Sequence, residues 1–530
     1  MTFDECFDVV VVGGGNAGFS AATTAAQAGA RVLLIEKAPL DDAGGNTYFT
    51  AAAFRCCFDG LGDLLPYLYQ SNGTKGLSQD VIDQIEMAPY TKADFDEASD
   101  IYRVTKGRAD PALAGLLVDE SREAVQWMMD NGARFMLSFN RQSFLADGRY
   151  KFWGGMVMNV IGQGKGLFQW HLELARTSGV TVRFGCPAIN LITDPDTNAV
   201  LGVRVYSNGR FSTIAAKGGV ILACGGFQAS PALRAKYLGP GWDIAHVRGT
   251  KYNVGDGHRM AESIGAMLEG NYSGCHSVAW DANSPRGSGD RGRTNQFTKS
   301  GYPLGVMINV DGKRFVDEGF DFRNFTYAVF GREILKQPQG IAFQVWDADG
   351  SKWLRHEEYA DYVTSNIRAD SLEGLAGILA TKGLTNKQQF LDTIEQFNEA
   401  CKDFQREQPG RSFDPAIRDG MSTQGKSRSL PLPKSNWAMP LEKGPFQAVE
   451  VTCGITFTFG GLAATPRAEV LSEATRRPIE GLWCAGEILG GLFFHNYPGG
   501  SGLTMGVIMG RAAGRGAAER AKGRSDDCMI

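Results

Sequence analysis

The sequence lacks long apolar runs and extended runs of basic residues. No segment reaches the ~18 consecutive apolar residues of a membrane-spanning helix. Lys and Arg total 54 against 58 Asp and Glu, a formal net charge of -4, so neither nucleic acid nor an anionic membrane surface is an expected partner. The acidic N-terminal stretch MTFDECFD does not fit a signal peptide. We therefore expect a soluble protein of the cytoplasm.

Cysteine and histidine are poorly placed for metal chemistry. The ten cysteines follow no metal-binding spacing, and the one close pair, Cys56 and Cys57, is adjacent. There is no C-x-x-C-H haem motif and no iron–sulfur cysteine run. We expect buried free thiols in a reducing compartment and no metal site.

Glycine, by contrast, is abundant, with 68 of 530 residues against an average of ~7%. Residues 7–12 (FDVVVV) predict a buried parallel strand, 19–29 predict an alanine-rich helix, and 31–37 (RVLLIEK) predict a second strand. The glycine-rich segment 13–18 joins the first strand to the helix. This is a complete βαβ unit, which is right-handed by default.

The glycine-rich segment carries the pattern of a dinucleotide site. Gly13, Gly15 and Gly18 form G-x-G-x-x-G. Glu36 ends the second strand, at the position where dinucleotide-binding folds place an acidic residue that binds the ribose hydroxyls. The glycines permit a tight turn, the approach of a pyrophosphate and close helix packing, and the helix N-terminus supplies positive potential. The same unit makes Asn16, Ala17 and Lys37 candidate cofactor contacts.

The middle of the chain has a different composition. Between residues 270 and 440 polar loops, aromatic residues and charge increase, and glycine-rich α/β sequence returns after 450. We predict a discontinuous nucleotide-binding domain (1–270 and 441–530) interrupted by an inserted α+β capping domain (271–440). Helices are predicted at 111–131 and 390–404, a strand at 220–227, and irregular structure at 405–440.

Further segments resemble the FAD contacts of known flavoproteins. They are GGNT (44–47), ILACGGF (221–227), GLWCAGEILGG (481–491) and GTKYNVGDGHRMA (249–261). The last is similar to a segment of the soluble fumarate reductase and succinate dehydrogenase flavoproteins. That family implies a Rossmann-like FAD-binding domain of the glutathione-reductase type. The contacts that it implies are Gly45, Asn46, Thr47, Ala223, Gly225, Gly226, Asp256 and Glu487.

The segment HNYPGGSGLTMG (495–506) combines two expected roles. Gly500, Ser501 and Leu503 open a predicted helix whose N-terminal amides would face the flavin's N1–C2=O edge, where negative charge gathers on reduction. His495 and Tyr497 would face the substrate.

The strongest resemblance lies in residues 301–328, which are similar to the family's GKRF-V-x-E block and the arginine loop that follows it. The family's proton-transferring arginine matches Arg323, with Asp321 and Glu318 as candidate relay partners. The alternative is that Arg323 forms a structural ion pair with Asp321 or Asp317. His276 matches a substrate-carboxylate histidine, although a lone histidine is more often structural.

A closer resemblance is to the FAD-dependent tricarballylate dehydrogenases, through GGNTYFTAAAFR, DGRYKFWGG, SGCHSVAWDAN and NYPGGSGLTMG. These enzymes oxidise a tricarboxylate to an alkene of the cis-aconitate type. The resemblance implies that Arg55, Arg149, His276 and Arg323 face substrate carboxylates, which suits bidentate guanidinium groups. Arg149 is alternatively a solvated loop charge.

The sequence departs from fumarate reductases at Tyr497, where they place an arginine that binds a substrate carboxylate. Loss of that contact removes ~1.5–3 kcal/mol of binding and argues against simple fumarate or succinate chemistry. The same Y-P-G motif occurs in 3-ketosteroid dehydrogenases, where a tyrosine polarises a carbonyl. Oxidation of an enolisable carbonyl substrate is therefore the alternative function.

Two further expectations concern how the flavin is bound and where its electrons go. The stretch GGNTYFTAAAF has no histidine where relatives attach FAD covalently, so we expect non-covalent FAD. Without haem or iron–sulfur motifs, electrons pass to a separate protein, a quinone or oxygen. A flavin-carrying subunit without a substrate of its own is the third possibility, and the direction of catalysis stays open.

Overall fold

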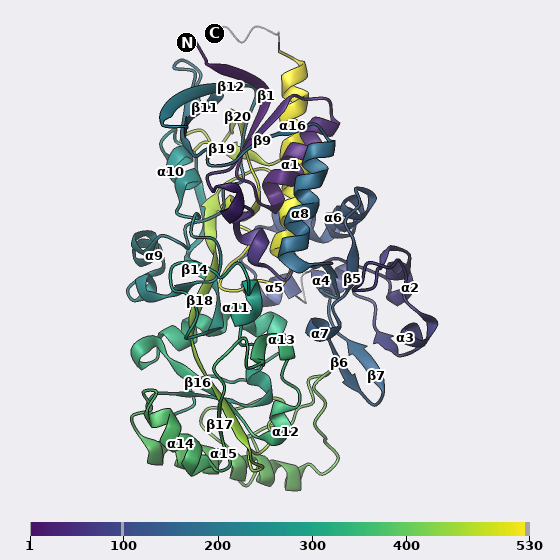
Figure 1. Cartoon of the computed structure of the whole chain (residues 1–530), viewed down its shortest axis with the longest axis vertical. Helices are drawn as coiled ribbons and strands as arrows, with labels where there is room; N and C mark the ends of the chain where they lie inside the picture. The colour runs from purple at the N-terminus through teal and green to yellow at the C-terminus, as the bar shows by residue number, and fades with distance from the viewer. Residues whose placement is uncertain (1, 97–99, 525–530) are drawn as a thin grey trace.

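The computed structural model describes residues 2–96 and 100–524 and contains two large sheets (Figure 1). The strands of the first sheet follow the order β10-β11-β12-β1-β2-β9, and β20 pairs with β12 and β19. Their bounds are β1 (Glu5–Val12), β2 (Val32–Ile35), β9 (Thr181–Arg183), β10 (Ala188–Thr193), β11 (Val200–Ser207), β12 (Arg210–Leu222), β19 (Glu469–Leu471) and β20 (Pro478–Cys484). β1 is parallel to β2 and β12, which confirms the predicted βαβ unit.

Three helices lie side by side next to the first sheet in Figure 1: α1 (Asn16–Gln27), α8 (Gln163–Thr177) and α16 (Ser501–Lys522). Glycines spaced four residues apart on α16 allow α1 to approach closely. A Cβ on Gly510 would lie 2.5 Å from the Ala17 carbonyl oxygen, and one on Gly514 would lie 2.4 Å from that of Ala21. The alanine-rich composition of α1 therefore serves helix packing.

The second sheet runs through the lower part of Figure 1 and is organised around one long strand, β18 (Phe446–Leu462). The other strands are β13 (His246–Val247), β14 (Leu268–Asp281), β15 (Val306–Asn309), β16 (Ala342–Trp346) and β17 (Ile367–Ala369). β14 and β16 pair antiparallel with different parts of β18. The predicted domain boundaries at 271 and 441 fall beside the starts of β14 and β18.

The remaining elements are two small sheets and the helices that surround the two large sheets. Two three-stranded sheets contain β3 (Ala53–Phe54), β8 (Met158–Val160) and β5 (Phe135–Leu137), and β4 (Ile85–Met87), β7 (Arg149–Phe152) and β6 (Ser143–Ala146). The other helices are α2 (Leu61–Leu64), α3 (Gln79–Asp83), α4 (Lys92–Phe95), α5 (Asp100–Thr105), α6 (Pro111–Asp130), α7 (Phe139–Gln142), α9 (Pro231–Leu238), α10 (Asp256–Glu262), α11 (Arg323–Leu335), α12 (Ala348–Ser351), α13 (His356–Tyr359), α14 (Leu372–Ala380) and α15 (Lys387–Glu407). Across the described part of the chain, every helix is too short or too polar to cross a bilayer.

The helices and strands predicted from the sequence are present, but several begin or end at other residues than predicted. α6 and α15 confirm the two predicted helices, and segment 408–440 contains no helix or strand among its described residues. α1 begins at Asn16 because the Thr47 hydroxyl accepts its backbone N–H at 2.8 Å. The strand predicted at 220–227 ends at Leu222, where the chain turns toward the cavity described below. The α/β fold class is confirmed.

Candidate active site

A cavity lies where the first sheet, the second sheet and the start of α16 meet. Its volume, measured as the space open to the centres of water molecules, is about 280 Å³. Its walls come from segments far apart in the chain, including the end of β1, the turn at 45–51, the start of α10, the middle of β18 and the start of α11. The cavity has two ends of different chemistry.

The first end, here the nucleotide end, is built from glycine and backbone amides. Gly13 has φ of +113°, and a Cβ there would lie 2.4 Å from the Ala223 carbonyl oxygen, so this turn requires glycine. The Glu36 carboxylate accepts the amide of Gly14 at 2.7 Å and that of Ala38 at 2.8 Å. Burial raises the pKa of Glu36.

Nearly all of the cofactor contacts predicted from the sequence line this cavity. The exceptions are Gly18, Gly226 and Ser501. A Cβ on Gly18 would lie 1.9 Å from the Gly13 carbonyl oxygen, and the Ser501 hydroxyl donates to the Pro498 carbonyl at 2.6 Å. These two residues shape the turns on which the lining residues sit.

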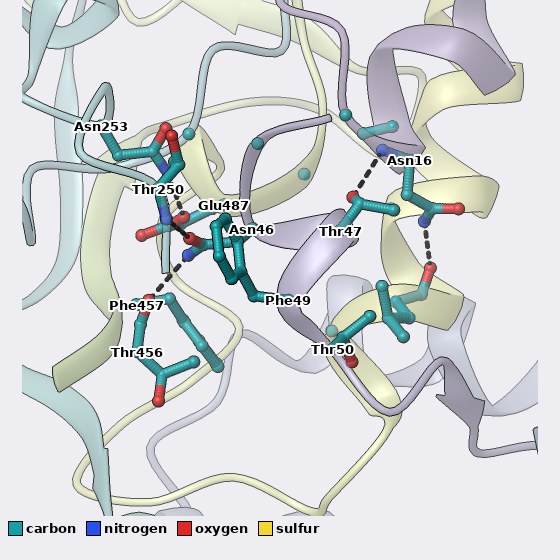
Figure 2. A pocket seen from close by; sticks show the side chains of 18 of the residues that line it. Asn16, Asn46, Thr47, Phe49, Thr50, Thr250, Asn253, Thr456, Phe457 and Glu487 are labelled. Carbon is teal, nitrogen blue, oxygen red and sulfur yellow. Dashed lines mark hydrogen bonds between the residues drawn. The ribbon is translucent and has the colours of Figure 1, made fainter. Parts of the chain in front are cut away.

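Asn46 joins three segments at the centre of the cavity (Figure 2). Its amide nitrogen donates to the Thr456 carbonyl at 2.7 Å, and its side-chain oxygen accepts the Thr250 amide at 3.1 Å. Figure 2 also shows Asn16 and Thr47 joined on the other side of the turn. The turn 44–47 is thus fixed by hydrogen bonds before any ligand is present.

Glu487 faces the cavity from the end of the first sheet. It accepts the Thr458 amide at 3.0 Å and the Asn253 side-chain amide at 3.2 Å. Burial raises its pKa to about 7.

The nucleotide end fits FAD. The glycine turn at 13–15 and the N-terminus of α1 border the cavity, the arrangement that receives a pyrophosphate in dinucleotide-binding folds. Gly500, with φ of +83°, opens α16 onto the same cavity. No histidine is among the described residues that line the cavity, and the non-covalent binding of FAD stays a prediction. In residues 2–96 and 100–524 there is also no group of three His, Cys, Asp or Glu side chains placed to hold a metal ion.

The second end, here the substrate end, contains Arg323, the first residue of α11. Among the described residues Arg323 has no hydrogen-bond or ion-pair partner; its guanidinium lies 5.9 Å from the centre of the Trp153 ring. Asp321 is instead paired with Arg103, and Asp317 accepts the Ser435 amide at 2.9 Å. The alternative of a structural ion pair for Arg323 is therefore not seen.

The expected relay partners of Arg323 also lie elsewhere. Glu318 is fully buried, accepts the Met307 amide at 2.8 Å and pairs with Arg314. Asp321 is held by Arg103, and neither carboxylate lines the cavity. Their predicted relay role does not fit these positions, because both carboxylates are already neutralised by other arginines.

An aromatic group borders the substrate end. The hydroxyl groups of Tyr327 and Tyr497 are hydrogen-bonded, and both side chains line the cavity. His276 packs behind them, its ring centre 4.8 Å from that of Tyr327 and 4.9 Å from that of Tyr497, and it stacks on Phe457. Burial and the nearby Arg248 hold the pKa of His276 well below its usual value, so this histidine is neutral rather than a cation.

Four residues expected to bind substrate are not in the cavity wall: His276, described above, and Arg55, Arg149 and His495. Arg55 is fully buried and donates to Asp100 at 2.5 Å, to Tyr90 and to the Gly499 carbonyl at 2.8 Å. It therefore supports the turn before α16 from behind. Arg149 is exposed on β7. These positions do not fit contact with a substrate carboxylate.

His495 likewise lies outside the lining. Its carbonyl accepts the Arg332 guanidinium at 3.0 Å, and a ring nitrogen lies 3.0 Å from the same group. Burial and Arg332 lower its pKa to about 4, so the ring is neutral and accepts a hydrogen bond from the arginine.

The structure instead brings polar residues to the substrate end that the sequence did not single out. They share buried atoms without a hydrogen-bond partner among the described residues, and they are Arg141, Gln142, Arg248, Thr298 and Asn324. Asn324 and Tyr327 follow Arg323 on α11. They could have been found from the sequence, because they lie in the same segment, 301–328, that indicated Arg323. Arg141 and Arg248 belong to no motif, and only the fold reveals them.

Among the described residues, Glu358 is the one acidic side chain that lines the substrate end. Its carboxylate accepts Arg355 at 2.8 Å and the Ser300 amide at 3.2 Å, and lies 3.5 Å from Arg141. Burial alone would raise its pKa, but Arg355 and Arg141 hold the pKa below its usual value. The substrate end is therefore predominantly cationic.

Comparisons with known proteins agree with this geometry. A family model described as "FAD binding domain" matches residues 78–503, and one described as "FAD dependent oxidoreductase" matches residues 8–134. The chain is 26% identical to the probable fumarate reductase Ifc3 of Shewanella frigidimarina, over 98% of this chain and 76% of that protein.

Solved structures show the same fold. The open conformation of a flavocytochrome c3 fumarate reductase matches with a TM-score of 0.69 at 25% identity, covering 98% of this chain and 79% of that one. A 3-ketosteroid delta1-dehydrogenase from Sterolibacterium denitrificans matches with a TM-score of 0.70 at 19% identity, covering 98% and 100%; this second likeness bears on the fold alone.

Proposed function

Because the chain belongs to the family of FAD-binding-domain oxidoreductases, we propose that it interconverts a carbon–carbon single and double bond next to the carboxylates of a polycarboxylate such as tricarballylate. The enzyme is flavin-dependent, and its relatives include fumarate reductases. The substrate class is the proposal. It is carried by one observation: the substrate end places three arginines beside buried amide and hydroxyl groups that lack partners.

These groups suit an anionic, hydrogen-bonding ligand. A buried polar group without a partner costs ~1–3 kcal/mol, and more when it is charged. Arg141, Arg248 and Arg323 supply charge-assisted donors for carboxylates. Asn324 and Thr298 add neutral donors within the same wall. A substrate with several carboxylates would satisfy groups that the protein leaves open.

FAD, when bound, supplies the hydride acceptor. In the alkene-reducing direction Arg323 would donate a proton from its guanidinium to the carbon next to a carboxylate. The alkene-forming direction is the reverse, in which the neutral guanidine takes that proton; among the described residues this group has no hydrogen-bond or ion-pair partner. Tyr327 and Tyr497 stay protonated, because burial raises the pKa of both phenols. One hydroxyl donates to the other, which leaves one O–H of the pair as a donor to substrate. Phe457 and Phe493 exclude water from this side of the cavity.

The tyrosine pair also supports a second candidate function. A phenol in a buried hydroxyl pair could polarise a substrate carbonyl, as expected for oxidation of an enolisable ketone. The cationic wall argues against it, because a neutral ketone would leave the buried Arg248 without a counterion.

Anaerobic reduction of the bound flavin tests the proposal. Tricarballylate, succinate and a 3-ketosteroid are added separately to the FAD-loaded protein, and the flavin absorbance is followed. We expect tricarballylate to bleach the flavin fastest. Bleaching by the ketosteroid alone would establish the second function, and bleaching by none of the three would favour an electron-carrying subunit.

A further inference from the structure

The substrate end contains an arginine, Arg248, that has no part in the proton transfer assigned to Arg323. We infer that Arg248, assisted by Arg141, is the specificity-determining residue that binds a carboxylate beyond those next to the reacting carbons. The inference rests on the proposed function, because it names the part of that site which separates tricarboxylates from dicarboxylates.

The backbone fixes Arg248 in the cavity wall. It directly follows β13, and its own amide donates to the Ile455 carbonyl on β18 at 2.9 Å. Its side chain is only 9% exposed and lines the cavity. The position is therefore set by the second sheet and not by a mobile loop.

The guanidinium of Arg248 is poorly neutralised. One nitrogen donates to the Thr456 hydroxyl at 2.9 Å, and the Trp280 ring centre lies 5.7 Å away. Its Nε is buried without a partner, and no carboxylate of the described residues lies within ion-pair distance. Burial lowers its pKa, whereas the nearby phenols of Tyr327 and Tyr497 raise it. A buried cation in this state favours an incoming anion.

Arg141 approaches the same space from α7. Its Nε lies 3.3 Å from Glu357 and its Nη2 lies 3.5 Å from Glu358, but neither contact has hydrogen-bond geometry, and both nitrogens lack a partner. The Glu358 carboxylate is bound more closely by Arg355 and Ser300. Arg141 and Arg355 thus share the Glu358 carboxylate, and Arg141 also lies within ion-pair distance of Glu357 without hydrogen-bonding to it.

The arginines stand on different walls. Arg323 begins α11, whereas Arg248 comes from the β13–β18 wall, next to Thr456. A substrate whose reacting carbon faces Arg323 can therefore extend a further carboxylate toward Arg248 and Arg141. A dicarboxylate that places both of its carboxylates next to the reacting carbons has no group left for this position.

The test measures binding and specificity in the FAD-loaded protein. Dissociation constants for tricarballylate and succinate are obtained from the perturbation of the flavin spectrum in wild type, Arg248→Met and Arg248→Lys. We expect Arg248→Met to weaken tricarballylate binding by ~10- to 100-fold and succinate binding by less than ~3-fold. Arg248→Lys should recover part of the loss, because it keeps the charge without the bidentate geometry.

A matched control is Arg467→Met, which removes an exposed arginine outside the cavity and should leave both constants unchanged. Equal weakening of both ligands by Arg248→Met would overturn the inference. Wild-type protein that binds neither ligand would overturn the inference and the proposed function together. Each variant is first compared with wild type for its ratio of flavin to protein absorbance.

The binding and reduction experiments separate the two claims. If tricarballylate binds in an Arg248-dependent manner but does not bleach the flavin, the proposed function fails and the assignment of Arg248 stands. If the flavin bleaches and Arg248→Met binds tricarballylate as wild type does, the function stands and the assignment fails.

Discussion

The two ends of the cavity are built on opposite principles. At the nucleotide end the polar side chains already have partners: Asn46 joins Thr456 and Thr250, and Glu36 accepts two backbone amides. At the substrate end Arg248 and Asn324 keep buried atoms without partners among the described residues. The polar side chains of the nucleotide end are thus satisfied by the protein, whereas those of the substrate end need a ligand to satisfy them.

This difference indicates where each end gets its function. The nucleotide end presents a shape, made by glycine turns and backbone amides, so its value lies in the geometry of the chain. The substrate end presents charge on long side chains held by packing. Substitutions at the nucleotide end should therefore change folding and flavin content, whereas substitutions at the substrate end should change turnover and specificity.

The largest expected effect is the loss of turnover in Arg323→Ala. Removing a positioned acid–base group typically costs 10²- to 10⁴-fold, and among the described residues Arg323 makes no hydrogen bond or ion pair whose loss would unfold the protein. We expect kcat for tricarballylate oxidation to fall by ~10³-fold or more with unchanged flavin content. The measurements are steady-state kinetics with an artificial electron acceptor and the flavin absorbance.

Arg418→Ala is the matched control, since Arg418 is exposed and lies 3.9 Å from Asp321, which is two residues before Arg323. It should retain wild-type kcat. Retained turnover in Arg323→Ala would remove this residue from proton transfer.

At the nucleotide end, Gly13→Ala should act on folding. The new Cβ would lie 2.4 Å from the Ala223 carbonyl oxygen, in a backbone conformation with φ of +113°. We expect ~2–4 kcal/mol of destabilisation and protein without FAD, measured by denaturant unfolding and by the flavin-to-protein ratio.

Gly29→Ala separates strain from crowding. Gly29 has φ of +92° but open space around its Cβ position, so only the backbone strain of ~1 kcal/mol applies. It should keep its flavin. An equal loss of stability in the two variants would show that the close approach to Ala223 is unimportant.

The same difference explains how much the sequence predicted. The nucleotide end could be predicted because each contact belongs to a short segment of fixed geometry: Gly13, Gly15 and Glu36 lie within one βαβ unit, and Asn46 and Thr47 lie within one turn. Backbone geometry is local, so a local pattern describes it. The fold class followed from the same unit.

The substrate end could be predicted only in part. Arg323 and Tyr497 are implied by the resemblance to known flavoprotein segments, and both line the cavity. The resemblance to tricarballylate dehydrogenases also implies Arg55 and Arg149 there, but Arg55 pairs with Asp100 and Arg149 is exposed. Arg141 and Arg248, which also line the cavity, are placed by long-range pairing and packing, which composition and spacing do not encode.

Tyr497→Phe removes one hydroxyl of the Tyr327–Tyr497 pair and should reduce activity less than Arg323→Ala does. If the substrate is a polycarboxylate, the loss of one neutral hydrogen bond costs ~0.5–1.5 kcal/mol, so kcat/KM for tricarballylate should fall by less than ~10-fold. Tyr327→Phe removes the other hydroxyl of the pair and should behave similarly. A loss above ~100-fold in Tyr497→Phe alone would favour the carbonyl-polarising function.

The smallest predicted effect concerns Glu487 and pH in the flavin-free protein. Burial raises the pKa of Glu487 to about 7, so the folded state holds a proton that the unfolded chain releases near its ordinary value of 4.5. Stability from this group is therefore fully present below pH 4.5 and is lost as pH rises through 7. The effect should be on the order of 1 kcal/mol, because the side chain faces an open cavity.

Glu487→Gln shows this as a difference in Tm that depends on pH. Glutamine stays neutral, so the Tm of wild type relative to Glu487→Gln should decrease by ~1–3 °C between pH 5 and pH 8 and change little above that. Glu473→Gln, at an exposed glutamate, should show a flat difference over the same range. A flat difference for Glu487→Gln as well would mean that Glu487 is ionised throughout, and the cavity near the first sheet would then be better solvated than its hydrogen bonds to Thr458 and Asn253 indicate.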